Sequence, residues 1–169
     1  MKKIFIPILS LTLLFTGCSE DFLDPTKPSE ELVINTRGGI IGAANGLQQL
    51  WSVDRLSPVY TTITGNGFTT KELRLLNAGN VDEGELSVGG EVLSTKNGLV
   101  NNLWSQCLII NSESQKVLDH INVLTIENEK ASVFVHASIF KDLALSTLVE
   151  YFQSVSLKTG KNASFNTKA

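Results

Sequence analysis

The helical spacing of apolar residues in the second half of the chain is the feature that most limits the fold. Apolar side chains recur every three or four residues from about Leu99 to Val123, and again from about Glu127 to Leu157. This spacing places them on one helix face, which must be buried against another element. The expected buried faces are Val100, Trp104, Cys107, Asn111, Ser114, Leu118 and Ile121, and Val133, Ala137, Phe140, Ala144, Leu148, Tyr151 and Val155. The spacing predicts an all-α fold.

A further helix is expected from about Glu30 to Trp51, with Ser29 as its N-cap. Gly38, Gly42 and Gly46 recur once per turn of this segment, and glycine disfavours a helix interior by about 1 kcal/mol relative to alanine. The repeat therefore suggests that another helix backbone approaches closely. The alternative is a phosphate-binding glycine loop, but the segment has neither a preceding strand nor a following Gly-Lys-Ser/Thr.

Turn-forming residues are dense between residues 52 and 98. We expect a long irregular insertion here, with a short helix at about 69–76 and short strands at about 59–63 and 86–93. Loops of this length within a compact domain are usually functional or result from an incorrect element assignment.

The first residues have the order of a signal peptide. Two lysines precede an apolar run from Ile4 to Phe15, which is shorter than the roughly 20 residues that span a bilayer as a helix. Thr16-Gly17-Cys18 follows and resembles the bacterial lipobox, in which the chain is cut before a cysteine that is then acylated. Residues 1–17 are predicted to be the signal peptide and Cys18 the lipid anchor. A plain secretory signal is the alternative.

Residues 18–29 contain two prolines and several charges, which are typical of a solvated tether. Ser19, Glu20 and Asp21 resemble the acidic signal that directs Bacteroidota lipoproteins to the cell surface; a merely hydrophilic spacer is the alternative. Acylation of Cys18 would leave Cys107 as the only remaining thiol, so the sequence does not predict a disulfide framework.

The composition disfavours several classes of function. Hydrophobic residues make up 42% and charged residues 18% of a chain with a net charge of −3, so a nucleic-acid-binding basic surface is not expected. Two cysteines and two histidines do not form a structural zinc site by themselves. Neither a metal nor a cofactor is predicted. Asp82, Glu83 and Glu85 form a tight acidic cluster, read here as a solvated loop or, alternatively, as a calcium site.

No coherent catalytic set is visible, and the chain is not predicted to be an enzyme. Cys107 lies on the apolar stripe and is expected to be a small buried hydrophobe rather than a nucleophile paired with His120. His136 is expected to be a packed or solvated side chain. Asn111, on the same stripe as Cys107, requires a hydrogen-bond partner if it is buried.

Several short sequence segments, taken in chain order, resemble the SusD/RagB family of outer-membrane nutrient-binding lipoproteins. They are Cys18-Ser-Glu-Asp-Phe-Leu-Asp, Asn45-Gly46-Leu47 with Leu50-Trp51, Leu103-Trp104 with Ile110-Asn111 and Lys116-Val117-Leu118, and Ala137 with Phe140 to Ala144 and Tyr151 to Val155. The resemblance implies tetratricopeptide-like helical repeats with a long irregular insertion. Because family members are several times longer, residues 30–169 are expected to be the amino-terminal part of an incomplete SusD-like domain.

The resemblance also implies a function and a location. Such proteins are anchored by lipid in the outer membrane, at the cell surface, and bind an oligosaccharide or peptide for import through a SusC-like TonB-dependent barrel. Tyr60 and Phe68 are the candidate rings for stacking on a sugar, and Arg74 is the candidate hydroxyl partner. The alternatives are a scaffold lipoprotein, whose helices serve protein interaction, and a lipid-anchored hydrolase, for which no catalytic cluster is found.

Overall fold

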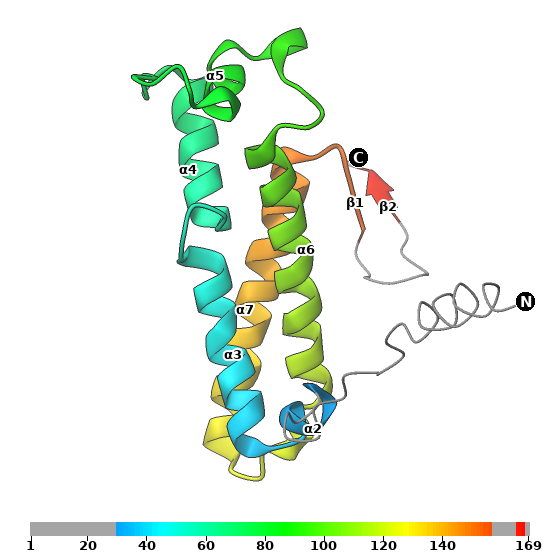
Figure 1. The fold of residues 1–169 in the computed structure, drawn as a ribbon. Coiled ribbons are helices and arrows are strands. Elements are labelled where there is room, and N and C mark those ends of the chain that lie inside the picture. The colour runs from blue at the N-terminus through cyan, green and yellow to red at the C-terminus, as the bar shows by residue number, and fades with distance from the viewer. Residues whose placement is uncertain (1–29, 157–164, 168–169) are drawn as a thin grey trace, which may run out of the picture.

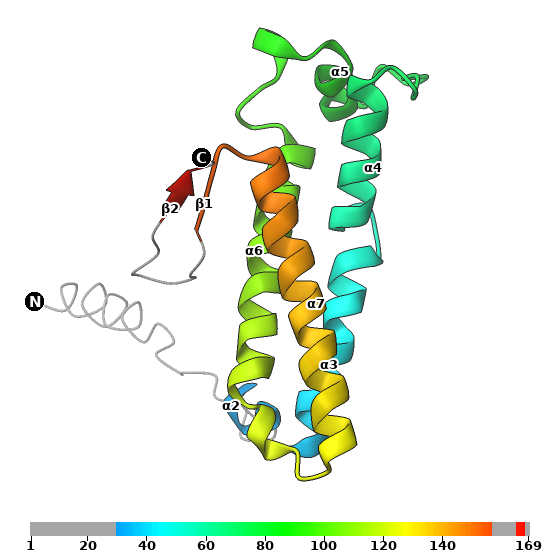
Figure 2. The same ribbon diagram turned by 180° about the vertical axis from the view of Figure 1, so that it is seen from behind.

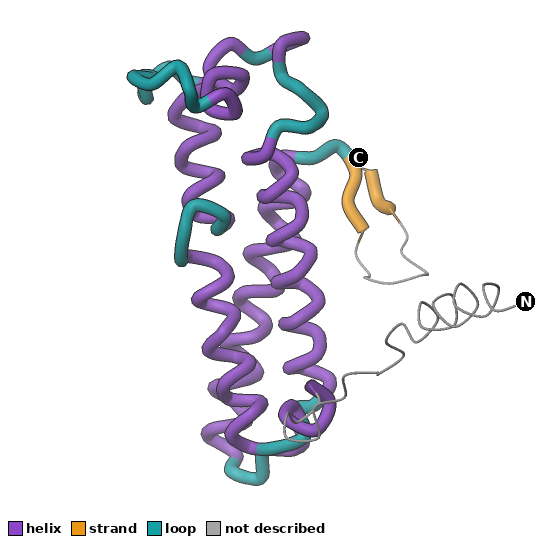
Figure 3. The backbone as a smooth tube through the Cα atoms, viewed as in Figure 1, coloured by secondary structure: helices purple, strands orange, loops and turns teal. Residues whose placement is uncertain are grey.

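The structure is a computed structural model that describes residues 30–156 and 165–167, and most of this part of the chain is helical (Figures 1 and 3). The all-α prediction is therefore confirmed. In chain order the elements are α2 (Glu30–Ile34), α3 (Arg37–Ser52), α4 (Pro58–Thr69), α5 (Val81–Val88), the 3-10 turn η1 (Gly90–Val92), α6 (Gly98–Asp119), the 3-10 turn η2 (Ile121–Val123), α7 (Glu127–Tyr151), β1 (Ser154–Ser156) and β2 (Phe165–Thr167).

The long helices run side by side as an elongated bundle (Figures 1 and 2). α3 and α4 follow each other end to end and form one rod, and α6 and α7 form the rods beside it. α6 runs antiparallel to α7 and to the α3–α4 rod. α5 and η1 lie at one end of the bundle, and α2 and η2 lie at the other.

The main hydrophobic core lies where α3, α6 and α7 meet. Leu47, Ile110 and Leu148 are fully buried there, one from each helix. Burying a side chain of this size stabilises the fold by roughly 1.5–3 kcal/mol. The predicted face of α7 is confirmed from Val133 to Leu148, which are both buried. The buried face of α6 is centred on Leu103, Cys107, Ile110 and Val117.

The predicted first helix is wrong in one respect, because it is interrupted after Ile34. Thr36 begins α3 as its N-cap: its hydroxyl accepts from the Gly39 amide at 3.0 Å, and its own amide donates to the Val33 carbonyl at 3.0 Å. A Cβ atom on Gly39 would lie 1.8 Å from the Val33 oxygen, so the turn requires glycine there. A Cβ added at Gly38, Gly42 or Gly46 would meet nothing within 4 Å, and the predicted close helix approach is wrong.

The predicted strand at 59–63 is also wrong, because this segment lies in α4. Ser57 caps the helix by accepting from the Tyr60 amide at 3.2 Å, and Pro58 occupies the first turn, where proline is well tolerated. The hydroxyls of Thr61 and Thr62 donate to carbonyls one turn back, at 3.0 and 2.8 Å. These bonds accommodate β-branched residues that favour strands by propensity alone.

The remaining elements predicted between residues 52 and 98 are also corrected. The expected helix at 69–76 is the loop after α4, which begins where Lys71 adopts a φ of 67°. The expected strand at 86–93 is instead the end of α5 followed by η1. Gly89 and Gly90, with φ of 70° and 60°, end α5 and separate it from η1, because they adopt a positive φ that glycine tolerates readily.

The last helix ends earlier than predicted, at Tyr151 rather than Leu157. Phe152 is extended (φ −121°, ψ 143°), and its ring meets Trp104 edge-on with centroids 4.9 Å apart. Val155, in β1, is 2% exposed and opposes Asn166 in the antiparallel pairing with β2. Both apolar residues continue the helical spacing, but they pack against the main core from extended backbone, Val155 buried and Phe152 partly buried. α6 likewise ends at Asp119, and its predicted last turn is η2.

Two adjacent glycines test the α2–α3 turn. Gly39→Ala is expected to lower the free energy of unfolding by about 1–3 kcal/mol, because the new Cβ collides with the Val33 carbonyl. Gly38→Ala is expected to raise it by about 0.5–1 kcal/mol, because its Cβ enters open space and alanine favours the helix. Urea unfolding followed by circular dichroism measures both. Changes of the same sign would contradict the described turn.

Candidate functional site

A groove between α3 and α6 is one candidate binding site in the described part of the chain. Its volume is about 670 Å³, within the range of roughly 300–1,000 Å³ that is usual for small-molecule sites. The α3–α4 connection contributes one part of its wall. The groove is lined by Ala43, Gly46, Gln49, Leu50, Val53, Asp54, Leu56, Ser57, Gln106, Ile109 and Glu113.

The groove combines exposed aliphatic surface with amide and carboxylate groups. Val53, Leu56 and Ile109 are 55%, 48% and 44% exposed, so the groove presents aliphatic side chains to solvent. Gln49 and Gln106 each offer both a donor and an acceptor. No aromatic ring is among the lining residues. This set suits a ligand that has aliphatic groups and amides of its own.

A second pocket, of about 400 Å³, lies between α3 and α7. Asn45, Asn128 and His136 are among its lining residues, and the Arg37–Glu129 ion pair joins the same two helices. The hydrogen bond and charge of Arg37 lower the pKa of Glu129, and the same contact raises the pKa of Arg37. The His136 ring packs against Phe140 with centroids 4.9 Å apart, which agrees with a packed histidine.

The three predicted ligand-binding residues do not form one site, because Tyr60 and Phe68 pack in a core and Arg74 lies apart in a loop. Phe68 is 8% exposed and packs with Leu86 in a small second core, with Tyr60 half-buried against it. Arg74 is exposed in the loop after α4. None of the three lines the grooves described above. The helix start at Ser57-Pro58 is the signal that sequence reasoning missed, since it puts Tyr60 and Phe68 on one buried helix face. Cys18, Ser19, Glu20 and Asp21 lie outside the described residues.

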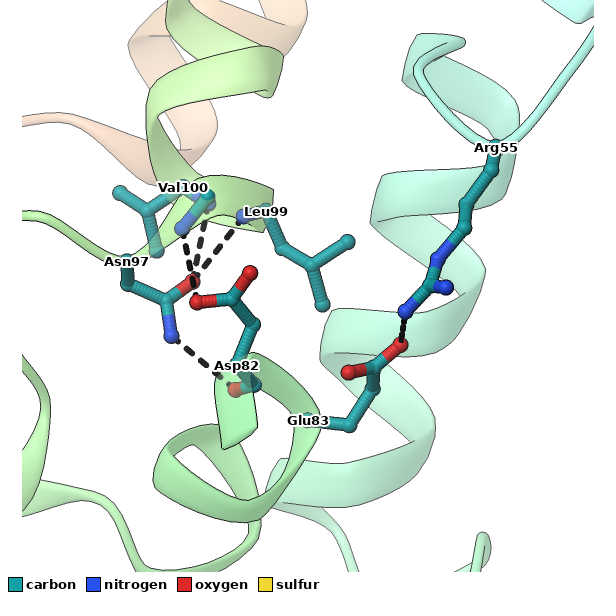
Figure 4. A network of polar contacts seen from close by, with 7 residues as sticks. Arg55, Asp82, Glu83, Asn97, Leu99 and Val100 are labelled. Atoms are coloured by element: carbon teal, nitrogen blue, oxygen red, sulfur yellow. Dashed lines mark hydrogen bonds and ion pairs between the residues drawn. The ribbon is translucent and has the colours of Figure 1, made fainter. Parts of the chain in front are cut away.

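The acidic cluster is part of the fold rather than a solvated loop (Figure 4). Asp82 accepts from the Gly98 amide at 3.0 Å, where a negative charge favours the N-terminus of α6. The Glu85 carboxylate accepts from the side-chain nitrogen of Asn97 at 2.9 Å. Glu83, 3% exposed, pairs with Arg55 of the α3–α4 connection. The charge and hydrogen bond of Glu83 raise the pKa of Arg55.

Through these contacts the three carboxylates hold α5 to the α3–α4 connection and to the start of α6. Asn97 completes the arrangement, because its side-chain oxygen accepts from the Leu99 and Val100 amides at 3.1 and 3.2 Å while its nitrogen donates to the Asp82 carbonyl at 3.0 Å (Figure 4). Among the residues that the structure describes, no group of three or more His, Cys, Asp or Glu side chains is placed to hold a metal ion.

Cys107 is fully buried in the main core, as the apolar stripe predicts. Burial raises the pKa of its thiol from 9.0 to about 12. His120, the histidine nearest to it in sequence, lies at the far end of α6 with its Nδ1 2.8 Å from the Lys116 carbonyl oxygen. Cys107 therefore acts as a packing residue.

Asn111 is buried on the same face as Cys107, and its side-chain oxygen has no hydrogen-bond partner in the described part of the chain.

Comparison with known proteins adds no relative: no family model matches the chain, and no curated protein or solved structure is significantly similar to it.

Asn97 gives a test of the network at the end of the bundle. Asn97→Ala is expected to lower the free energy of unfolding by about 2 kcal/mol, because it removes an N-cap and leaves two buried acceptors with one donor fewer. Asn80→Ala is the matched control: Asn80 is the N-cap of α5 but makes no capping bond, so a change within about 0.5 kcal/mol is expected. Equal losses in urea unfolding would contradict this role.

Burial of Cys107 predicts low thiol reactivity. In a Cys18→Ser variant, Cys107 is the only thiol, and at pH 8 iodoacetamide is expected to modify it slowly in the folded chain and rapidly in urea. The unfolded thiol ionises near 9.0 and the folded one near 12, so the stability contributed by the protonated thiol is lost as the pH rises through this interval. Mass spectrometry measures the modification. Fast labelling of the folded chain would place Cys107 at an accessible site.

Proposed function

We propose that this chain is a lipid-anchored outer-membrane protein that binds peptide nutrient in the α3–α6 groove for import through a SusC-like TonB-dependent barrel. The sequence supports the anchor and the family: Cys18 follows a lipobox-like segment, and the helix phrases resemble the SusD/RagB family. Two or three acyl chains hold a protein stably on a membrane. The proposal includes a tetratricopeptide-like arrangement, with which the antiparallel α6–α7 pair is compatible.

The groove between α3 and α6 is the observation that carries this proposal. Its 670 Å³ accommodates a short peptide. Exposed Leu56 and Ile109 offer contacts for aliphatic side chains, while Gln49 and Gln106 offer hydrogen bonds for a peptide backbone. The oligosaccharide alternative is less well supported, because sugar rings pack best against aromatic faces and none lines the groove.

A leucine at Gly46 tests whether the groove is the binding site. Gly46 lines the groove, and a Cβ there meets nothing within 4 Å, so Gly46→Leu fills the groove without straining α3. Gly38→Leu is the matched control, because Gly38 is equally open but does not line the groove. The purified chain is incubated with a casein peptide digest and, separately, with malto-oligosaccharides, and retained molecules are identified by mass spectrometry.

We expect peptides with aliphatic side chains to be retained by the unmodified chain and by Gly38→Leu, and at least tenfold less by Gly46→Leu. Retention of malto-oligosaccharides instead of peptides would replace the proposed ligand. Equal retention of peptides by both variants would move binding away from the groove.

The anchor and the transporter need a separate measurement. Affinity purification of the chain from bacterial outer membranes is expected to yield an acylated Cys18 and a large TonB-dependent barrel, both identified by mass spectrometry. Substitution of Cys18 by Ser is expected to remove the acyl mass and the membrane association. An unmodified Cys18 with no barrel partner would contradict the proposal.

A scaffold role is the second candidate, and the outer face of α7 favours it. Phe134, Val135 and Ile139 are each more than half exposed, at 53%, 53% and 52%. α7 is also long and apolar enough to pass a length-and-composition test for a membrane span, a test that core helices of bundles pass as well. Ile139→Glu is expected to remove a protein partner from the purified material if this face is the interaction surface. Gly46→Leu, which changes the groove and not this face, is expected to retain that partner.

A further inference from the structure

The bundle contains two hydrophobic cores that do not merge. The main core joins α3, α6 and α7, and the second contains Phe68, Leu86 and Leu99, from α4, α5 and α6. A cavity of about 210 Å³ lies between them, more enclosed than the grooves described above. Leu86 and Leu99 of the second core line one part of it, and Leu103 and Phe152 of the main core line another.

Small residues on α4 keep this space open. Thr61 and Gly65 lie one turn apart on α4 and both line the cavity. A Cβ atom built on Gly65 would meet nothing within 4 Å. Protein interiors are close-packed, and voids larger than a water molecule are few. A leucine or valine at position 65 would close most of the space while favouring the helix more than glycine does.

The cavity has one hydrogen-bond donor to offer. The Thr61 hydroxyl is used within its own helix, donating to the Ser57 carbonyl at 3.0 Å. Tyr151 lines the cavity, and its hydroxyl accepts from the Asn66 side-chain nitrogen at 2.7 Å. Within the described residues, the proton of this hydroxyl has no acceptor. The other lining side chains are aliphatic or aromatic.

We propose that this cavity binds a small apolar molecule of about two fused rings that carries one hydrogen-bond acceptor, with the Tyr151 hydroxyl donating to that acceptor. An apolar cavity of about 150 Å³ is known to stay dry and to bind benzene, so a cavity of 210 Å³ suits a bicyclic ligand. None of the residues of the α3–α6 groove lines the cavity. This site is therefore independent of the proposed peptide binding.

Two probes of equal shape separate the apolar contact from the hydrogen bond. 1-Indanone has two fused rings and a carbonyl acceptor, and indane has the same rings without the oxygen. Each is titrated by isothermal calorimetry into the Cys18→Ser chain, which needs no detergent that would compete for apolar probes. We expect saturable binding of both, with 1-indanone bound about threefold to tenfold more tightly.

Variants assign the binding to the cavity. Gly65→Leu is expected to weaken both probes more than tenfold, and Gly38→Leu, which lies outside the cavity, is expected to leave both unchanged. Tyr151→Phe is expected to remove the preference for 1-indanone while leaving indane within about twofold. Gly65→Ala, a smaller change, provides the same test if leucine unfolds the chain, and it is expected to weaken indane severalfold.

Three results would overturn the proposal. They are the absence of saturable binding of either probe to the Cys18→Ser chain, binding to Gly65→Leu equal to that of the Cys18→Ser chain, and a Tyr151→Phe variant that retains the preference for 1-indanone. Circular dichroism of each variant confirms that a loss of binding is not a loss of fold.

Discussion

The packing of α6 against α7 is the interaction on which the other elements depend. Cys107, Ile110 and Val117 of α6 are fully buried, as are Ala137, Ala144 and Leu148 of α7. Isolated helices are marginal in water, so most of the stability of each helix comes from burying its apolar face against the other. α3 adds Ile40 and Leu47 to the same core. α4 and α5 pack instead on a smaller cluster, and a polar network around Asn97 and Glu83 holds them to the bundle.

This division between a large and a small core explains where the openings lie. The α3–α4 rod changes direction at Val53–Ser57, and the groove beside α6 lies at that junction. The smaller, partly open cavity lies where the two cores meet, next to Gly65. α7 carries more apolar residues than one packed face uses, which leaves Phe134, Val135 and Ile139 exposed. The proposed binding surfaces therefore lie where packing between the helices is incomplete.

Apolar spacing predicted α6 and most of α7 because long, periodic segments have few alternatives. It failed at Phe152 and Val155, which keep the helical spacing but lie on extended backbone, where Phe152 is partly buried and Val155 is buried. Between residues 52 and 98 the threonines and glycines favoured a prediction of turns and strands. They outweighed Ser57-Pro58, which is the N-cap and first residue of α4. For the same reason Tyr60 and Phe68 were expected in an irregular insertion, whereas both lie in α4, where Phe68 is buried in a core and Tyr60 is half-buried beside it.

The sequence alone determined the helical class, the two long helices of the second half and the buried, inert character of Cys107, since each follows from local periodicity and composition. It also contains the lipobox-like segment at Cys18, which depends on residue order and not on folding. Tertiary structure alone decided that Asp82 and Glu85 cap and hold α6, and that Gly65 borders a cavity. These properties depend on atoms brought together from distant segments, and no local pattern specifies such neighbours.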